Sequence, residues 1–177
     1  MYKRQDQLSK YEFDKIFPGC RLLDIHEYLL EKGVRLEGVG GVRYMYHDPC
    51  HTPMKTYAPL AVVNDLMGTS VALNERCCGE SGTLAVTRPD ISTQVRHRKD
   101  EVMRRGAEQL RADGYSGKVK VLTSCPSCLQ GLSRFDEDAG TQADYIVVEL
   151  AKHLLGENWM PEYVAKAVAG GIERVLV

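Results

Sequence analysis

The sequence lacks an excess of charge of either sign, because its 177 residues include 23 basic and 24 acidic side chains and carry a net charge of −1. A nearly neutral chain gives no electrostatic reason to expect binding to nucleic acid or to an anionic membrane surface. No stretch approaches the roughly 20 apolar residues that a membrane-spanning helix needs. The opening segment, MYKRQDQLSK, also lacks the apolar core of a signal peptide. We therefore expect a cytoplasmic protein that associates with a membrane only peripherally and through a partner.

Several catalytic signatures are missing as well. The sequence shows no Ser-His-Asp arrangement, no Walker loop and no dinucleotide-binding fingerprint. What it does contain is six cysteines in a chain of the usual length for one domain. That number is small for a disulfide scaffold and large for a cytosolic domain. Clustered cysteines in a reducing compartment indicate metal or redox chemistry.

The hydrophobic pattern predicts short strands that alternate with helices. The expected strands are 42–46, 70–73 and 118–122, and the expected helices are 20–32, 58–67, 90–114, one after TSCPSC, 145–155 and one that starts near residue 161. Residues 1–19 are polar, and we expect them to be loosely helical. This order is typical of an α/β domain with a mainly parallel sheet flanked by helices.

Five of the cysteines share one position in this pattern. Each follows an expected strand and precedes an expected helix, and the five are Cys50, Cys77, Cys78, Cys125 and Cys128. The carboxyl ends of parallel strands meet at one edge of a sheet, where ligands of α/β proteins gather. We therefore expect the cysteine loops to lie together at the C-terminal ends of the strands. Cys20 has no strand before it and lies elsewhere.

The cysteine spacings favour a polynuclear metal site. Cys125 and Cys128 lie one turn apart at an expected helix start, where unpaired N–H groups stabilise thiolates. The side chains of the adjacent Cys77 and Cys78 diverge, so they suit different metal atoms of one cluster, and Gly79 lets the backbone approach that cofactor closely. Five thiolates exceed the four that complete a tetrahedral zinc site. The surplus indicates an iron–sulfur cluster.

The segments YHDPCH, ERCCGESG and VLTSCPSC resemble the three blocks of the cysteine-rich CCG domain. That domain occurs in the B subunit of heterodisulfide reductase and in iron–sulfur subunits of glycolate oxidase, anaerobic glycerol-3-phosphate dehydrogenase and lactate-utilisation complexes. The resemblance covers about residues 42–155. It implies that Cys50, Cys77, Cys78, Cys125 and Cys128 hold a [4Fe-4S] cluster, which in some members is non-cubane, or zinc in some domain copies.

The resemblance also implies a function. We expect an electron-transfer module of an oxidoreductase, with no catalytic residue of its own, that receives electrons from a flavin-containing dehydrogenase domain or subunit, or from a second iron–sulfur domain. Family members commonly carry two such domains, and residues 19–33 weakly resemble the later cysteine-helix segments. We therefore expect 1–35 to be the tail of a preceding copy, with Cys20 its remnant, and 36–177 to be one cysteine-rich domain. The chain would be the C-terminal module of a longer, FAD-linked protein.

Three other interpretations use the same residues. A structural zinc domain for assembly needs four thiolates, or three with His47 or His51. A thiol–disulfide module needs Cys125 and Cys128, and buried structural thiols need no ligand at all. Next to Cys50, His47 and His51 are candidate ligands, although we favour hydrogen-bonding or structural roles. We expect His26, His97, His153 and the basic side chains of 96–105, Lys99 included, to lie on exposed helix faces.

Overall fold

The computed structural model describes residues 11–80 and 83–170. Its centre is a sheet of four strands, all parallel, in the order β2-β1-β3-β4. The strands are β1 (Val42–Tyr46), β2 (Ala72–Leu73), β3 (Lys118–Thr123) and β4 (Gln142–Tyr145). Met45 lies opposite Ala72 on one side and Val121 on the other. The expected α/β class with a parallel sheet is confirmed.

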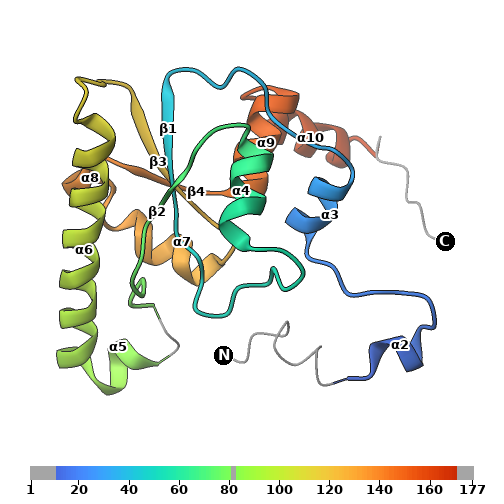
Figure 1. The fold of residues 1–177 in the computed structure, drawn as a ribbon, viewed down its shortest axis with the longest axis horizontal. Coiled ribbons are helices and arrows are strands. Elements are labelled where there is room, and N and C mark those ends of the chain that lie inside the picture. Colours follow the sequence, from blue (N-terminus) through green and yellow to red (C-terminus); the bar gives the residue numbers. More distant parts are fainter. Residues whose placement is uncertain (1–10, 81–82, 171–177) are drawn as a thin grey trace.

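Helices cover both faces of the sheet (Figure 1). The face with Tyr44 and Tyr46 packs against α4 (Pro59–Met67) and α9 (Ile146–Leu155), and α3 (Ile25–Glu31) packs on α4. On the opposite face, Met45, Val119 and Val121 share a core with the long helix α6 (Pro89–Arg111) and with α7 (Pro126–Ser133). The remaining helices are α2 (Phe13–Ile16), α5 (Leu84–Thr87), α8 (Asp136–Ala139) and α10 (Trp159–Val168). Alternation along β1 therefore divides its side chains between two cores.

Several helix boundaries follow from local sequence signals. Pro59 and Pro89 stand in the first turn of α4 and α6, where a missing N–H costs nothing. Gly68 ends α4 in the left-handed conformation, with φ +62°. Its missing side chain is also required for packing, because a Cβ there would lie 1.9 Å from the carbonyl oxygen of Leu36. Close packing fixes this helix end.

The structure corrects three expected elements. The helix expected over 20–32 begins only at Ile25, because Asp24 and Glu27 form a capping box at its start. Cys20 therefore lies outside any helix and is exposed. The expected acidic loop before residue 141 contains the short helix α8, and the segment after it adds β4. Residues 1–10 of the loosely helical segment lie outside the described residues.

Within the described residues, none of the helices combines the length and apolar character that crossing a bilayer requires.

Candidate metal centre

The five cysteines meet at the carboxyl edge of the sheet, although three separate segments supply them. Cys50 follows β1, the vicinal pair follows β2, and Cys125 caps the start of α7 after β3. The Sγ atoms of Cys50 and Cys77 are 3.9 Å apart, and those of Cys78 and Cys128 are 3.4 Å apart. All five cysteines are free thiols. We call this group, Cys50, Cys77, Cys78, Cys125 and Cys128, the five-cysteine site.

Backbone hydrogen bonds beyond the strands position two of the three loops. The N–H of His47 donates to the carbonyl of Leu122 at 2.9 Å, and the N–H of Asn74 donates to Tyr46 at 2.8 Å. The Tyr46 hydroxyl donates to Asp48 at 2.8 Å, which orients the turn before Cys50. The loops therefore extend the parallel ladder past the sheet edge, and the site is built on rigid elements.

The turn at the vicinal cysteines uses unusual backbone conformations. Arg76 adopts a left-handed φ of +67°, which is costly for a residue with a side chain. Gly79 follows with φ +79°, and its N–H donates to the Cys77 sulfur at 3.4 Å. A Cβ on Gly79 would lie 2.9 Å from the Arg96 side chain. Only glycine therefore fits beside the vicinal pair in this conformation.

The site is buried on one side and open on the other. Cys78, Cys125 and Cys128 are at most 5% exposed, whereas Cys77 is partly exposed and Cys50 is exposed. The deep sulfurs lie in the core on the α6 side of the sheet. The site is therefore open to solvent on the side of Cys50.

The thiols interact strongly through charge and hydrogen bonding. Hydrogen bonding with Cys128 and with Cys77 holds the pKa of Cys78 well below its usual range. Interactions with Cys125 and with Cys78, together with burial, raise the pKa of Cys128, and Cys78 raises the pKa of Cys77. The pKa of Cys128 is raised because its nearest neighbours are other sulfurs, and the expectation that both cysteines at the start of α7 give thiolates to a metal stays a prediction.

The two flanking histidines differ in environment. His47 is 1% exposed, and its ring nitrogen and the Sγ atoms of Cys78 and Cys128 lie within 4.8 Å of one another. Its Nε2 is buried and has no hydrogen-bond partner among the described residues. A buried nitrogen without a partner beside thiols is unusual and makes this group a candidate binding site. His51 is exposed and does not join this buried group.

Lys99 is a site residue whose position the sequence pattern predicted wrongly. We expected it on the exposed basic face of α6, but it is fully buried. Its ammonium contacts His47 Nδ1 at 3.1 Å and the carbonyls of Glu75 at 2.7 Å and Arg76 at 3.3 Å. The sequence did contain a sign of this burial, because Lys99 lies four residues before Met103 and eight before Ala107, on the buried stripe of the helix.

The remaining histidines lie away from the site. His97 is exposed, as expected. His26 is buried instead and pairs with Asp24 at the start of α3. His153 lies 3.1 Å from the Tyr44 hydroxyl, on the α9 side of the sheet.

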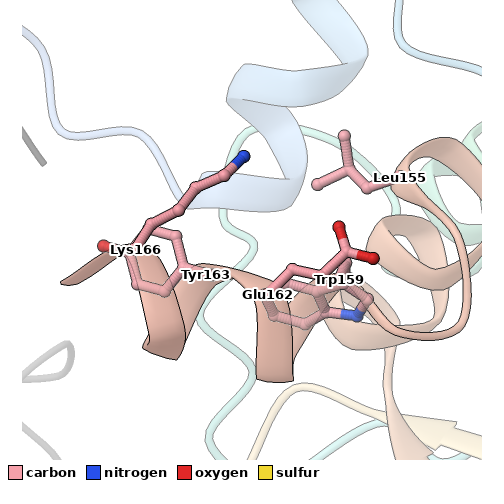
Figure 2. Close-up of a pocket in the computed structure, with 5 residues that line it drawn as sticks. All are labelled: Leu155, Trp159, Glu162, Tyr163 and Lys166. Carbon is pink, nitrogen blue, oxygen red and sulfur yellow. The ribbon is translucent and has the colours of Figure 1, made fainter. Parts of the chain in front are cut away.

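A separate cavity of about 460 Å³ lies on α10 and the end of α9 (Figure 2). Leu155, Trp159, Glu162, Tyr163 and Lys166 line it. It contains no cysteine and none of the loops at the carboxyl edge. It is therefore distinct from the five-cysteine site.

Comparison with known proteins gives two family matches. Residues 44–133, which hold all five cysteines of the site, match the cysteine-rich domain (CCG) family. Residues 133–177 match a domain of unknown function, DUF3400. A curated relative, the B subunit of the fumarate reductase (CoM/CoB) of Methanothermobacter marburgensis, is 29% identical over 127 residues. That alignment covers 67% of this chain and 24% of the relative, so the chain spans about a quarter of the relative's length.

No solved structure matches the chain. The family match covers half of the sequence and includes every segment that carries the resemblance seen in the motifs. The three cysteine motifs are in family order, and their sulfurs meet at one sheet edge. The chain belongs to the cysteine-rich domain (CCG) family.

Proposed function

We propose that the five-cysteine site binds an iron–sulfur cluster, of the [4Fe-4S] type, and that the chain is an electron-transfer module of an oxidoreductase. The observation that carries the proposal is the convergence of five thiols from three loops on one sheet edge. Iron–sulfur clusters are held by cysteine thiolates. The donor set fits, since it offers one more sulfur than a tetrahedral zinc takes.

A bound cluster would supply reversible one-electron chemistry. The protein's own residues would set its conditions. The Gly79 N–H directed at Cys77 stabilises charge on that sulfur, and the buried Cys78 and Cys128 limit water on the inner side. The exposed Cys50 marks the side from which electrons would enter and leave.

The partners we propose follow from the family and the relative. The relative is named as a reductase subunit, which supports a module that works with other subunits. We propose a flavin-containing domain or a second iron–sulfur domain as electron donor, with residues 1–35 as the tail of a preceding copy and 36–177 as one domain. We further propose a cytoplasmic location, with membrane contact only through a partner.

Metal analysis of anaerobically purified protein tests the proposal. We expect brown protein with about four iron and four acid-labile sulfides per chain. Cys78→Ser should lose most of the iron, since Cys78 is the most interconnected thiol of the site. Cys20→Ser is the matched control and should keep it, because Cys20 is exposed and outside the site. Equal iron in both variants would contradict the assignment.

A zinc site is the second candidate. It is favoured by the buried group of His47, Cys78 and Cys128, whose ligand atoms lie within 4.8 Å of one another. Such a site would hold a structural ion and transfer no electrons. Colourless anaerobic protein with one tightly bound zinc per chain would support it and overturn the iron–sulfur proposal.

A further inference from the structure

Lys99 is buried without the partner that a buried ammonium normally has. Its side chain comes from the middle of α6 and reaches the carboxyl edge of the sheet. No ion pair joins it to a carboxylate among the residues that the structure describes. An uncompensated buried charge is costly, so the positive charge needs a negative group nearby.

The five-cysteine site supplies that negative group. Burial lowers the pKa of Lys99 to about 8, and negative charge on Cys78 and Cys128, followed by Cys77 and Cys50, acts in the opposite direction. The Lys99 ammonium contacts the carbonyls of Glu75 and Arg76, in the segment that leads into Cys77 and Cys78. Negative charge on the sulfurs and the buried lysine therefore stabilise each other inside the protein.

The contacts of Lys99 also determine where His47 carries its proton. Lys99 Nζ lies within 3.3 Å of five possible acceptors, which are the two oxygens of Asn74, the carbonyls of Glu75 and Arg76, and His47 Nδ1. An ammonium only donates, and a hydrogen on Nδ1 would face it donor to donor at 3.1 Å, so Nδ1 bears no proton and Nε2 does. The carbonyl of Asn74, 3.4 Å from Nδ1, is the competing partner that would favour the other tautomer. The Lys99 ammonium lies closer to Nδ1 than this carbonyl does, so the ammonium determines the tautomer.

A proton on Nε2 makes His47 a donor to sulfur. This nitrogen is buried and has no hydrogen-bond partner among the described residues, and a ring nitrogen of His47 lies within 4.8 Å of the Cys78 and Cys128 sulfurs, the nearest groups that could accept its hydrogen. A metal ion would have to displace this hydrogen before Nε2 could bind it. In metal-free protein the geometry therefore favours the hydrogen-bonding role over the ligand role that the sequence left open.

We propose that Lys99 is a positioning residue of the five-cysteine site. Its ammonium holds His47 with Nε2–H toward the sulfurs and anchors the Asn74–Glu75–Arg76 backbone that leads into the vicinal cysteines. A buried positive charge and a donor to sulfur both stabilise the reduced, more negative state of a cluster, so the pair raises its reduction potential. Only the expected effect on the reduction potential of the cluster rests on the proposed function. The tautomer of His47 does not depend on it.

The first experiment measures the tautomer in reduced, metal-free protein. Nitrogen–proton correlation spectra of isotope-labelled histidine distinguish Nδ1–H from Nε2–H, and a His47→Gln variant assigns the signal. We expect Nε2–H in the wild type. In Lys99→Met we expect Nδ1–H, because Nδ1 is then free to donate to the Asn74 carbonyl. Nδ1–H in the wild type, or the same tautomer in both proteins, would overturn the positioning role.

The second experiment measures the reduction potential of iron-loaded protein. Lys99→Met should make the ratio of reduced to oxidised cluster about tenfold smaller at a given potential. For a one-electron couple, this corresponds to a reduction potential that is lower by about 59 mV. Lys120→Met is the matched control, because Lys120 is also a buried lysine but pairs with Glu149 at 2.6 Å, on the opposite face of the sheet. An equal shift in the two variants would overturn the proposal.

A second pair of variants decides the matter if Lys99→Met does not fold. His47→Gln places an amide N–H near the position of Nε2, and His47→Asn places one near Nδ1. We expect the Gln variant to keep the wild-type potential and the Asn variant to fall below it. The reverse order would contradict the proposal. Absence of iron and sulfide from anaerobic wild-type protein would instead refute the proposed function, and the tautomer would still decide the role of Lys99.

Discussion

Glycine sets how closely α7 approaches the vicinal cysteines. A Cβ built on Gly131 would lie 3.0 Å from the Cys78 carbonyl oxygen, 3.3 Å from the Cys78 Cβ and 2.5 Å from the Glu80 side chain. The first two neighbours belong to the loop that carries the site and cannot move without it. This single position therefore couples helix packing to the arrangement of sulfurs.

Gly131→Ala should displace the Cys78 loop. We expect an overpacking cost of about 1–3 kcal/mol, which exceeds the gain of up to about 1 kcal/mol from replacing glycine in a helix. Iron retained after anaerobic gel filtration should fall. Gly106→Ala is the control, since its closest neighbour is the flexible end of Met45 at 2.5 Å. Equal iron retention would show that the contact with Cys78 is unimportant.

At the scale of elements, a buried polar network joins the sheet to α9. Glu149 is 1% exposed and accepts hydrogen bonds from Lys120 at 2.6 Å and from the Tyr44 hydroxyl at 2.8 Å. Lys120 and Tyr44 are register neighbours on β3 and β1. One carboxylate thus ties a helix to two adjacent strands.

Removing that carboxylate should destabilise the fold. Glu149→Ala leaves the Lys120 ammonium buried without its partner, which costs about 3–5 kcal/mol. Urea unfolding measures the change. Glu101→Ala is the surface control, and because Glu101 is exposed we expect less than about 0.5 kcal/mol. A small change for Glu149→Ala would mean that water or a neighbour replaces the lost partner.

The same network predicts a pH dependence. Burial alone would raise the pKa of Glu149, but hydrogen bonds from Lys120 and Tyr44 outweigh it and lower the pKa below the ordinary 4.5. A carboxylate with a lowered folded-state pKa stabilises the fold above pH 4.5, and this contribution is lost as the pH falls through the lowered value. Wild-type stability should therefore fall more steeply than that of Glu149→Gln between pH 5 and 3, to be measured by urea unfolding. Parallel curves would rule out this role.

Helix α3 supports the segment that follows Cys50. The buried carboxylate of Glu27 accepts the backbone N–H groups of Thr56 and Tyr57, at 2.7 Å and 2.9 Å. α3 also packs against α4, which begins directly after that segment. Helix α3 therefore orders a loop next to the five-cysteine site.

Glu27→Ala should loosen this loop. Charge-assisted hydrogen bonds are worth about 1.5–3 kcal/mol each, and both are lost. We expect faster proteolysis between residues 48 and 57, where Lys55 offers a trypsin site. Glu27→Gln keeps an accepting oxygen and should lie nearer the wild type. Unchanged cleavage in Glu27→Ala would show that the loop is held by other contacts.

At the scale of the whole molecule, the five-cysteine site links segments that are distant in the chain. It joins the loops after β1, β2 and β3, which belong to three adjacent strands. A group bound only by the folded protein adds stability, about 2.7 kcal/mol at a hundredfold excess over its dissociation constant. Iron-loaded protein should therefore unfold at a higher temperature than metal-free protein. Cys78→Ser should abolish the difference, and an equal shift in that variant would place the metal elsewhere.

Much of the fold and of the candidate site was predictable from the sequence. Hydrophobic alternation, helix-starting prolines and terminal glycines are local signals, so β1, β3, α4 and α6 lie close to where they were expected. The five cysteines each follow a strand, and parallel strands bring their carboxyl ends to one edge. The motif order alone indicated the family, because the ligand types and their order are written directly in the chain.

Only the tertiary structure placed Lys99, His47 and β4. A lysine in a basic helical stretch looks exposed in the sequence, and its burial depends on where α6 packs over the sheet. The proton position on His47 depends on Lys99, which lies 52 residues away along the chain. β4 is short and gains its hydrogen bonds from β3. These features arise from contacts between distant segments, and no local pattern records which segments will meet.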